Sequence, residues 1–182
     1  MQPYFPPNIS RINIVGTSGS GKSTFAKALA EKLSCNYVEM DAIWWKENWQ
    51  NISEEEFLLR LETTLAGNNW VLDGNYSVTT PIKWANVQMV IWLDLPFHIT
   101  LYRAVKRAVL RAITKQEIWH GNRESWRKLL SKDSIVWWTL TTYKRNILKY
   151  EDLMCDQQFG HIQFVRLRNL KQVHEFLASA NS

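Results

Sequence analysis

The chain has 182 residues and a mass of 21.4 kDa, with 22 Lys and Arg against 17 Asp and Glu, which gives a formal charge of +5. Apolar residues make up 46% of it, which excludes a largely disordered chain, and no apolar run reaches the roughly 18 residues of a membrane-spanning helix. We expect one domain over residues 1–182. The first residues lack the pattern of a secretory signal, and Cys35 and Cys155 lie far apart, so we expect a cytoplasmic protein with reduced thiols.

Two features of the composition need an explanation, the basic excess and the ten Trp residues. Basic side chains interleaved with aromatic ones are typical of nucleic-acid binding. Nucleic acid is therefore one candidate partner, to be weighed against the phosphorylated small molecules that the motifs of this chain predict.

The hydrophobic pattern predicts strands and helices in alternation. Short apolar or β-branched runs predict strands at residues 11–15, 37–40, 70–72, 87–93 and 162–167. Apolar residues at helical spacing predict helices at residues 22–33, 53–67, 97–113, 126–150 and 170–177. This alternation indicates a parallel sheet that is covered by helices on both faces.

Four of the predicted strands end at a glycine or an aspartate, at Gly16, Asp41, Asp73 and Asp94. Ligands of open parallel sheets bind outside the carboxyl ends of the strands. We therefore expect these four positions to lie near one binding site.

Residues 16–23 match the phosphate-binding pattern GxxxxGKS/T between a predicted strand and a predicted helix. Glycines let successive backbone N–H groups point at a phosphate, and the start of the helix adds positive potential. We expect Lys22 to reach the β- and γ-phosphates of ATP and the Ser23 hydroxyl to bind Mg²⁺. The residues predicted to bind the nucleotide are Gly16, Thr17, Ser18, Gly19, Ser20, Gly21, Lys22, Ser23 and Thr24.

A Mg²⁺ site needs a second anchor, and Asp73 and Asp94 compete for it. Asp94 closes the more apolar strand, whereas Asp73 precedes Gly74, which allows another group to approach closely. We favour Asp73 and keep Asp94 as the alternative.

Arginines recur at positions 103, 107 and 111, which places them on one face of the predicted helix 97–113. Phosphoryl transfer needs cations around the transferred group, so we expect Arg103 and Arg107 to neutralise its charge. The polar stretch 114–125 between two helices predicts a lid that excludes water, and Arg123 in it is a further candidate for the phosphates.

The phosphate loop, Asp41, residues 72–74, Arg103 and Arg107 together resemble the small P-loop kinases related to adenylate, shikimate and gluconate kinases. The resemblance implies the α/β class and the three-layer P-loop NTPase fold, a five-stranded parallel sheet in the order 2-3-1-4-5 with helices on both faces and a short helical lid. Within that group the chain looks most like the FlaR-like family of adenylate kinase-like, or DNA topology modulation, proteins, on residues 73–76 and 121–125.

The same resemblance implies roles for single residues. It implies that Asp73 holds Mg²⁺ through water and that Arg168 contacts the adenine. It also implies that Arg103 and Arg107 correspond to the arginines with which the lid begins. Adenylate kinases continue their Asp-Gly pair with Phe-Pro-Arg, whereas this chain continues with Asn75 and Tyr76. The arginine that would grip an acceptor monophosphate is missing there, which disfavours AMP.

The acceptor is expected beside Asp41, where it sits in shikimate- and gluconate-type kinases. Asp41 would accept the hydrogen bond of a hydroxyl acceptor and orient it. Trp44 and Trp45 follow directly and would stack on a flat ring, and Asn75 and Tyr76 are further candidates. A nucleoside, a nucleotide and a small hydroxyl metabolite all stay open as acceptors, as does the oligomeric state.

The predicted function is a Mg²⁺-dependent, ATP-dependent kinase, and the alternative is an ATP-binding regulator that acts on DNA. Residues 103–128 hold eight basic and two acidic residues, a charge of +6, which leaves 14 basic and 15 acidic residues, or −1, elsewhere. The basic excess is thus confined to the predicted helix and lid that face the phosphate loop. The phosphates of a nucleotide are a sufficient partner for it, so nucleic acid is the less favoured partner.

Overall fold

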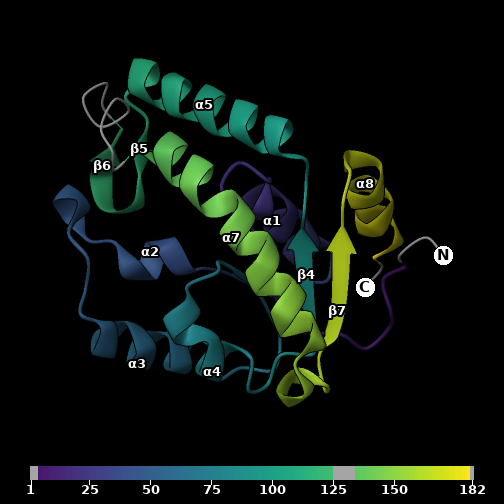
Figure 1. Cartoon of the computed structure of the whole chain (residues 1–182). Coiled ribbons are helices and arrows are strands. Elements are labelled where there is room, and N and C mark those ends of the chain that lie inside the picture. The colour runs from purple at the N-terminus through teal and green to yellow at the C-terminus, as the bar shows by residue number, and fades with distance from the viewer. Residues whose placement is uncertain (1–3, 125–133, 181–182) are drawn as a thin grey trace.

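In the computed structural model of the protein, residues 4–124 and 134–180 are described. A parallel sheet in the order β2-β3-β1-β4-β7 forms its centre (Figure 1). Its strands are β1 (Arg11–Gly16), β2 (Asn36–Glu39), β3 (Trp70–Asp73), β4 (Met89–Leu93) and β7 (Gln163–Leu167). Because β7 is the fifth strand of this sheet along the chain, the predicted order 2-3-1-4-5 is confirmed.

Helices follow the strands in alternation. They are α1 (Lys22–Lys32), α2 (Met40–Trp44), α3 (Glu54–Thr64), α4 (Thr80–Lys83), α5 (Phe97–Thr114), α7 (Ile135–Cys155) and α8 (Leu170–Ser179). Ser53 caps the start of α3, since its Oγ accepts a hydrogen bond from the Glu56 backbone N, which is one half of a capping box. The prediction of a helix over 126–150 falls partly outside the described residues. Its described part begins after Ser134 and continues to Cys155, beyond the predicted end.

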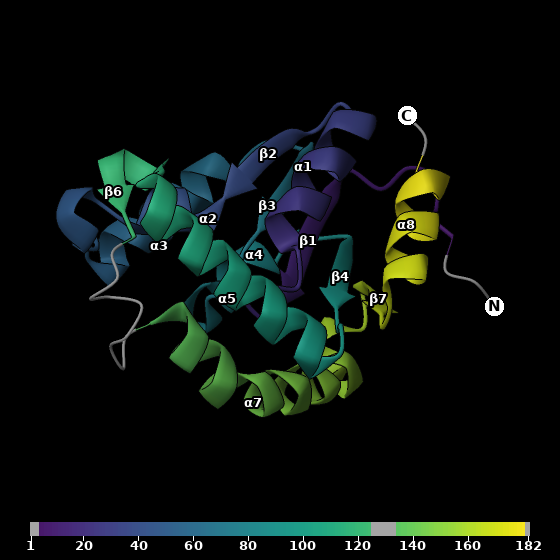
Figure 2. The ribbon, with the colours of Figure 1, turned by 90° about the horizontal axis from the view of Figure 1, so that it is seen from above.

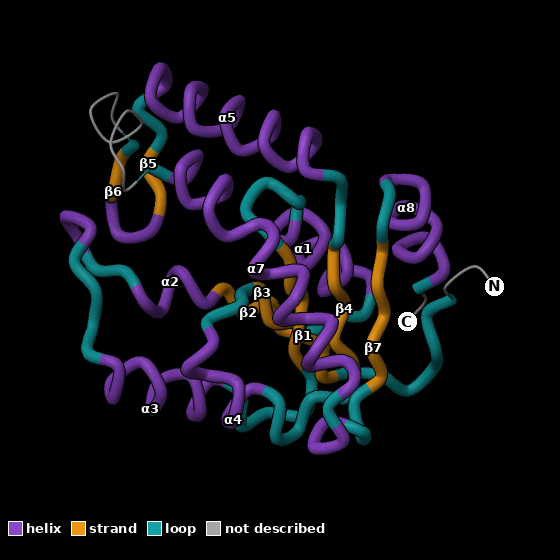
Figure 3. Tube along the Cα trace, viewed as in Figure 1, coloured by secondary structure: helices purple, strands orange, loops and turns teal. Residues whose placement is uncertain are grey.

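The helices cover the sheet on both faces, as predicted for a parallel sheet (Figures 2 and 3). Strand residues point alternately to the two sides, so Ile12 and Ile14 join one core with α1 and α8, and Val15 joins the other with α3 and α7. Helix α5 lies beyond the sheet edge of the phosphate loop and packs against α7. No described helix is both long enough and apolar enough to span a membrane.

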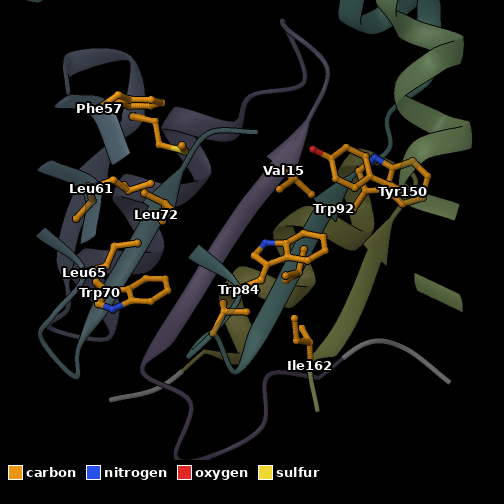
Figure 4. Close-up of a cluster of buried hydrophobic side chains, with 14 of the residues drawn as sticks. Val15, Phe57, Leu61, Leu65, Trp70, Leu72, Trp84, Trp92, Tyr150 and Ile162 are labelled. Atoms are coloured by element: carbon orange, nitrogen blue, oxygen red, sulfur yellow. The ribbon is translucent and has the colours of Figure 1, made fainter. Parts of the chain in front are cut away.

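Three tryptophans lie in the core on the α3, α4 and α7 side of the sheet (Figure 4). Trp70, Trp84 and Trp92 expose between 1% and 3% of their surface. The Trp92 ring packs against Tyr150, with 5.4 Å between centroids. Replacing such a buried aromatic by Ala typically costs about 3–5 kcal/mol of stability, so these three residues serve the fold.

Two sequence predictions were wrong in detail. Strand β2 ends at Glu39, and Met40 already begins α2, so Asp41 lies in the first turn of a short helix and not directly after the strand. Residues 115–124 do not form a helical lid. They form a small antiparallel hairpin of β5 (Glu117–Ile118) and β6 (Asn122–Arg123), because residues with left-handed backbone, Lys115 after α5 and His120 at the tip, turn the chain sharply.

Candidate active site

The phosphate loop between β1 and α1 depends on its glycines. Gly16, Gly19 and Gly21 have φ of +147°, +82° and +93°, which other residues rarely adopt. A Cβ on Gly19 would lie 2.1 Å from the carbonyl oxygen of Thr100 in α5. The loop can therefore approach the backbone of α5 only because this residue is glycine.

Lys22 begins α1 and points back over the loop. Its Nζ donates to the carbonyl oxygen of Thr17 at 3.2 Å, and Ser20 N donates to the same oxygen at 3.1 Å. Burial lowers the pKa of Lys22, the Asp73 carboxylate raises it, and the Arg107 guanidinium lowers it again. Lys22 is thus the centre of a group of interacting charges.

Two arginines of α5 lie against this loop. The Arg107 guanidinium donates to Ser18 Oγ at 2.9 Å, and Arg103 Nη1 lies 3.6 Å from where a Cβ of Gly21 would stand. Burial and the neighbouring charge of Arg111 lower the pKa of Arg107. The regular spacing of the arginines along α5 therefore brings positive charge over the loop that would hold phosphates.

The two competing aspartates have different surroundings. Asp73 is 5% exposed at the end of β3, and its Oδ2 accepts a hydrogen bond from the Tyr37 hydroxyl at 3.3 Å. Asp94 instead forms an ion pair with Arg166 at 2.8 Å, and Arg166 also stacks over Trp92 at 4.1 Å. Asp94 therefore has a structural partner, and Asp73 is the carboxylate beside Lys22.

Tyr37 had not been singled out from the sequence. Besides its bond to Asp73, its hydroxyl hydrogen-bonds with Ser23, and burial followed by the Asp73 charge raises its pKa. It thereby connects the hydroxyl and the carboxylate that are predicted to bind Mg²⁺. A tyrosine in a short strand is so common that its residue type carried no signal of this position.

Asp41 is bonded to the chain segment that follows β3. The Tyr76 hydroxyl donates to Asp41 Oδ1 at 2.6 Å. Burial raises the pKa of Asp41, and this hydrogen bond lowers it, as do the charges of Lys22 and Arg107. The predicted acceptor residues Asp41 and Tyr76 are therefore in contact, within electrostatic reach of the phosphate loop.

The neighbouring aromatic residues divide between core and surface. The Trp44 ring packs against Phe57 and Tyr76, with centroids 5.0 Å and 5.7 Å away. The Trp45 ring contacts Trp44 and, at 5.6 Å, Trp49. Trp44 thus supports Tyr76 from the core side, and Trp45 continues the aromatic contacts toward the hairpin.

The hairpin is held on the segment after β2. Asn122, only 3% exposed, accepts a hydrogen bond from Trp49 N and donates one to the carbonyl oxygen of Lys46, both at 2.7 Å. His120 Nε2 hydrogen-bonds with the carbonyl oxygen of Ala42 at 3.0 Å, and the Trp119 ring contacts Trp49. The predicted lid is therefore docked beside Asp41.

Glu39 is a further residue that had not been singled out. It ends β2, and burial raises the pKa of its carboxylate, as do the charges of Asp73 and Asp41, while a hydrogen bond with Trp119 lowers it. Its acidic side chain at the carboxyl end of a strand was a usable signal, which the misplaced end of β2 hid.

Residues 12–125 match the AAA domain family (AAA_18). The chain belongs to this family. A shikimate kinase of Synechococcus elongatus is 31% identical over an alignment of 132 positions, which covers 61% of this chain and 70% of that protein.

Solved structures place this AAA-family chain among the small P-loop kinases in fold. A gluconokinase from Sinorhizobium meliloti has a TM-score of 0.52 at 17% identity, covering 94% of this chain and 89% of its own. A shikimate kinase from Acinetobacter baumannii, in complex with shikimate, has a TM-score of 0.54 at 17% identity, covering 94% and 90%. At this identity the likeness concerns the fold alone.

The residues of this AAA domain fit a metal that arrives with a nucleotide. Within the described ranges no three His, Cys, Asp or Glu side chains are arranged to hold a metal by themselves. Mg²⁺ in kinase and ATPase sites is typically held by one or two protein carboxylates together with substrate phosphates. Ser23 and Asp73, both bonded to Tyr37, match that requirement.

Three further predicted residues have the following contacts. The Arg123 guanidinium forms an ion pair with Glu117 across the exposed hairpin. Arg168 is exposed after β7, and its backbone N donates to Gln172 Oε1 at 2.7 Å. Asn75 Nδ2 donates to the carbonyl oxygen of Gly16 at 3.3 Å, so it touches the phosphate loop from the side of β3.

Proposed function

We propose that this chain is an ATP-dependent kinase that transfers the γ-phosphoryl group to a hydroxyl group of a small metabolite. The observation that carries the proposal is the juxtaposition of Lys22 and Arg107 with the Asp41–Tyr76 pair at one end of the sheet. The curated and solved relatives named as shikimate kinase and gluconokinase support the same reaction class.

The residues of the phosphate side bind the phosphates of ATP and neutralise their charge. The loop amides and Lys22 hold the β- and γ-phosphates, and Arg103 and Arg107 balance the charge that spreads over the transferred group. Ser23 and Asp73 would hold Mg²⁺, which when bound neutralises charge on the β- and γ-phosphate oxygens. Arg123 and Arg168 remain predictions for the phosphates and the adenine.

The acceptor side orients the nucleophile. The Asp41 carboxylate accepts the hydrogen bond of the acceptor hydroxyl and takes its proton as that oxygen bonds to the γ-phosphorus and the bond to the β-phosphate oxygen breaks. Tyr76 holds the other end of this carboxylate in place. An acceptor phosphate would need no base and would be repelled by Asp41, so a hydroxyl acceptor is favoured over a nucleotide.

The hairpin would act as the lid. It lies beside Asp41 and is bonded to the segment after β2 through Asn122 and His120. In this position it would exclude water, which competes with the acceptor for the phosphoryl group.

The test is a screen of ATP consumption. The protein is mixed with Mg²⁺ and ATP and with nucleosides, nucleoside monophosphates, shikimate, gluconate and other small hydroxyl compounds. We expect a hydroxyl compound to accelerate ADP formation and to appear as a phosphate ester, and the Asp41→Asn variant to lose this acceleration while still binding ADP.

Two results would contradict the proposal. One is acceleration by nucleoside monophosphates alone, because Asp41 would then face a phosphate. The other is nanomolar binding of duplex DNA by a protein whose ATP consumption no acceptor accelerates, because the DNA-binding alternative would then account for the chain without a kinase reaction.

A further inference from the structure

The loop after β3 carries the carboxylate on which the proposed metal site depends. Asp73 ends the strand, and Gly74 follows with φ of +146°. A Cβ on Gly74 would lie 2.6 Å from the Met40 sulfur, so the chain is closely confined there. The backbone N of Gly74 donates to the carbonyl oxygen of Ile14 at 3.3 Å. The position of Asp73 is thus set by what holds these few backbone atoms.

A buried amide holds the backbone on both sides of Asp73. Asn13 lies in β1, next to β3, with no exposed surface. Its Nδ2 donates to the carbonyl oxygens of Leu72 at 3.0 Å and of Gly74 at 3.1 Å. These carbonyls belong to the residues before and after Asp73. The amide therefore bridges the peptide unit just before Asp73 and the peptide unit just after Gly74, and so confines the short stretch of backbone that carries the carboxylate.

A polar residue at this position of a central parallel strand is unusual, because such strands are buried on both faces and are ordinarily apolar. Burying an amide is costly unless all of its groups are bonded. The remaining group of Asn13, Oδ1, accepts a hydrogen bond from Trp84 Nε1 at 2.9 Å. Trp84 is 1% exposed, in the core after α4 (Figure 4).

Trp84 therefore orients the Asn13 amide. With Oδ1 bound to the indole N–H, the NH₂ group is directed at the two carbonyls, and the reverse orientation would oppose two acceptors. The ring itself is fixed by edge-on contacts with Phe159 at 4.9 Å and Phe164 at 5.6 Å. A series of contacts thus connects the aromatic core around Trp84, through Asn13, to the backbone that carries Asp73.

We propose that Asn13 and Trp84 are positioning residues for Asp73, with the Asn13 amide holding the carbonyls that flank this carboxylate and the Trp84 indole holding the amide. The inference rests on the proposed function, which assigns Asp73 to the metal. Neither side chain touches substrate. Their contribution lies in preorganising a metal ligand through its backbone, which is the role of the outer residues at other metal sites.

The test measures metal affinity apart from nucleotide affinity. Mn²⁺ binding to the protein with a non-hydrolysable ATP analogue is titrated by electron paramagnetic resonance, and binding of the analogue alone is titrated without metal. Asn13→Leu keeps the branched shape of the side chain but removes the NH₂ donors and the Oδ1 acceptor. We expect about tenfold weaker Mn²⁺ binding and an unchanged affinity for the metal-free analogue.

A milder variant guards against loss of folding. Trp84→Phe keeps the aromatic ring but removes the N–H that orients Asn13, and we expect about threefold weaker Mn²⁺ binding. Lys83→Met is the matched control. Lys83 is 2% exposed and donates to the carbonyl oxygen of Tyr76 at 3.0 Å, so it is equally buried and bonded to the same loop, but away from Asp73.

The outcomes separate this inference from the proposed function. Wild-type protein that binds neither the analogue nor Mn²⁺ contradicts the proposed function. Wild-type protein that binds both, with a folded Asn13→Leu or Trp84→Phe variant of the same Mn²⁺ affinity, overturns the positioning role alone. So does an equal loss in Lys83→Met, because the effect would then follow from core damage in general.

Discussion

The phosphate side and the acceptor side of the site are built in different ways. On the phosphate side, residues 16–23 are contiguous, and Arg103 and Arg107 are one helical turn apart. On the acceptor side, Asp41 meets Tyr76 across 35 positions of sequence, and Asn122 meets Trp49 across 73. The proposed phosphate site is thus local in the sequence, whereas long-range contacts assemble the proposed acceptor site.

The two sides also differ in charge. Lys22, Arg103 and Arg107 surround the phosphate loop, whereas Glu39 and Asp41 lie under the hairpin on the other side. Both of these half-buried acids have their pKa raised by desolvation and by neighbouring acids. The contrast suits transfer from a group that carries negative charge to one that loses a proton.

The largest expected effect comes from removing the central cation of the phosphate side. Lys22→Ala should lower phosphoryl transfer by about 10³-fold or more, because the β- and γ-phosphates lose their direct cation, while the thermal unfolding temperature stays near that of the wild type. Lys32→Ala in the last turn of α1 is the control and should retain its rate. An unchanged turnover in Lys22→Ala would contradict the mechanism.

The next effect tests whether α5 belongs to the phosphate side. Arg107→Ala should lower the rate by about 10²-fold, since one charged donor to the transferred group is lost. Lys106→Ala changes the neighbouring residue, which is exposed and faces the Tyr102 ring. Equal rates for the two variants would show that the arginine spacing has no catalytic meaning.

Replacing each of the two aspartates by asparagine tests which of them belongs to the metal site. Asp73→Asn should raise the Mg²⁺ concentration for half-maximal rate by about tenfold, because a carboxylate partner of the metal is lost. Asp94→Asn should leave this concentration unchanged and lower the free energy of unfolding by about 1–3 kcal/mol, because it weakens the ion pair with Arg166. Steady-state kinetics and urea unfolding measure the two effects, and the reverse pattern would favour Asp94 as the metal residue.

The smallest effect concerns the acceptor side and its pH dependence. In the proposed mechanism Asp41 acts as a carboxylate, so the rate should fall as pH drops through its pKa, which burial raises. The Tyr76 hydrogen bond lowers this pKa, so Tyr76→Phe should move the acidic limb of the pH–rate profile to higher pH, with a loss of only a few-fold at high pH. Tyr102→Phe, an exposed change on α5, should leave the profile in place. If the acidic limb does not move in Tyr76→Phe, Asp41 is not the base whose titration sets it.

Much of the fold was predictable, since a phosphate loop between strand and helix and the alternation of apolar runs indicate a three-layer parallel sheet. The end of β2 was predicted one residue too late because Met40 is apolar and fits either a strand or a buried helix start. The hairpin was missed because two-residue strands carry no periodic pattern, and its pairing depends on a turn with residues at positive φ.

The sequence by itself determined the phosphate loop and the arginine face of α5, because short-range backbone geometry and helical periodicity specify them, while the sheet order followed from the resemblance to the small P-loop kinases. The tertiary structure alone decided that Asp94 pairs with Arg166, that Tyr76 reaches Asp41, and that Asn13 and Trp84 hold the backbone around Asp73. Each of these depends on which residues distant in sequence meet at one edge of the sheet, and a hydrogen bond forms only once packing has brought both of its atoms together.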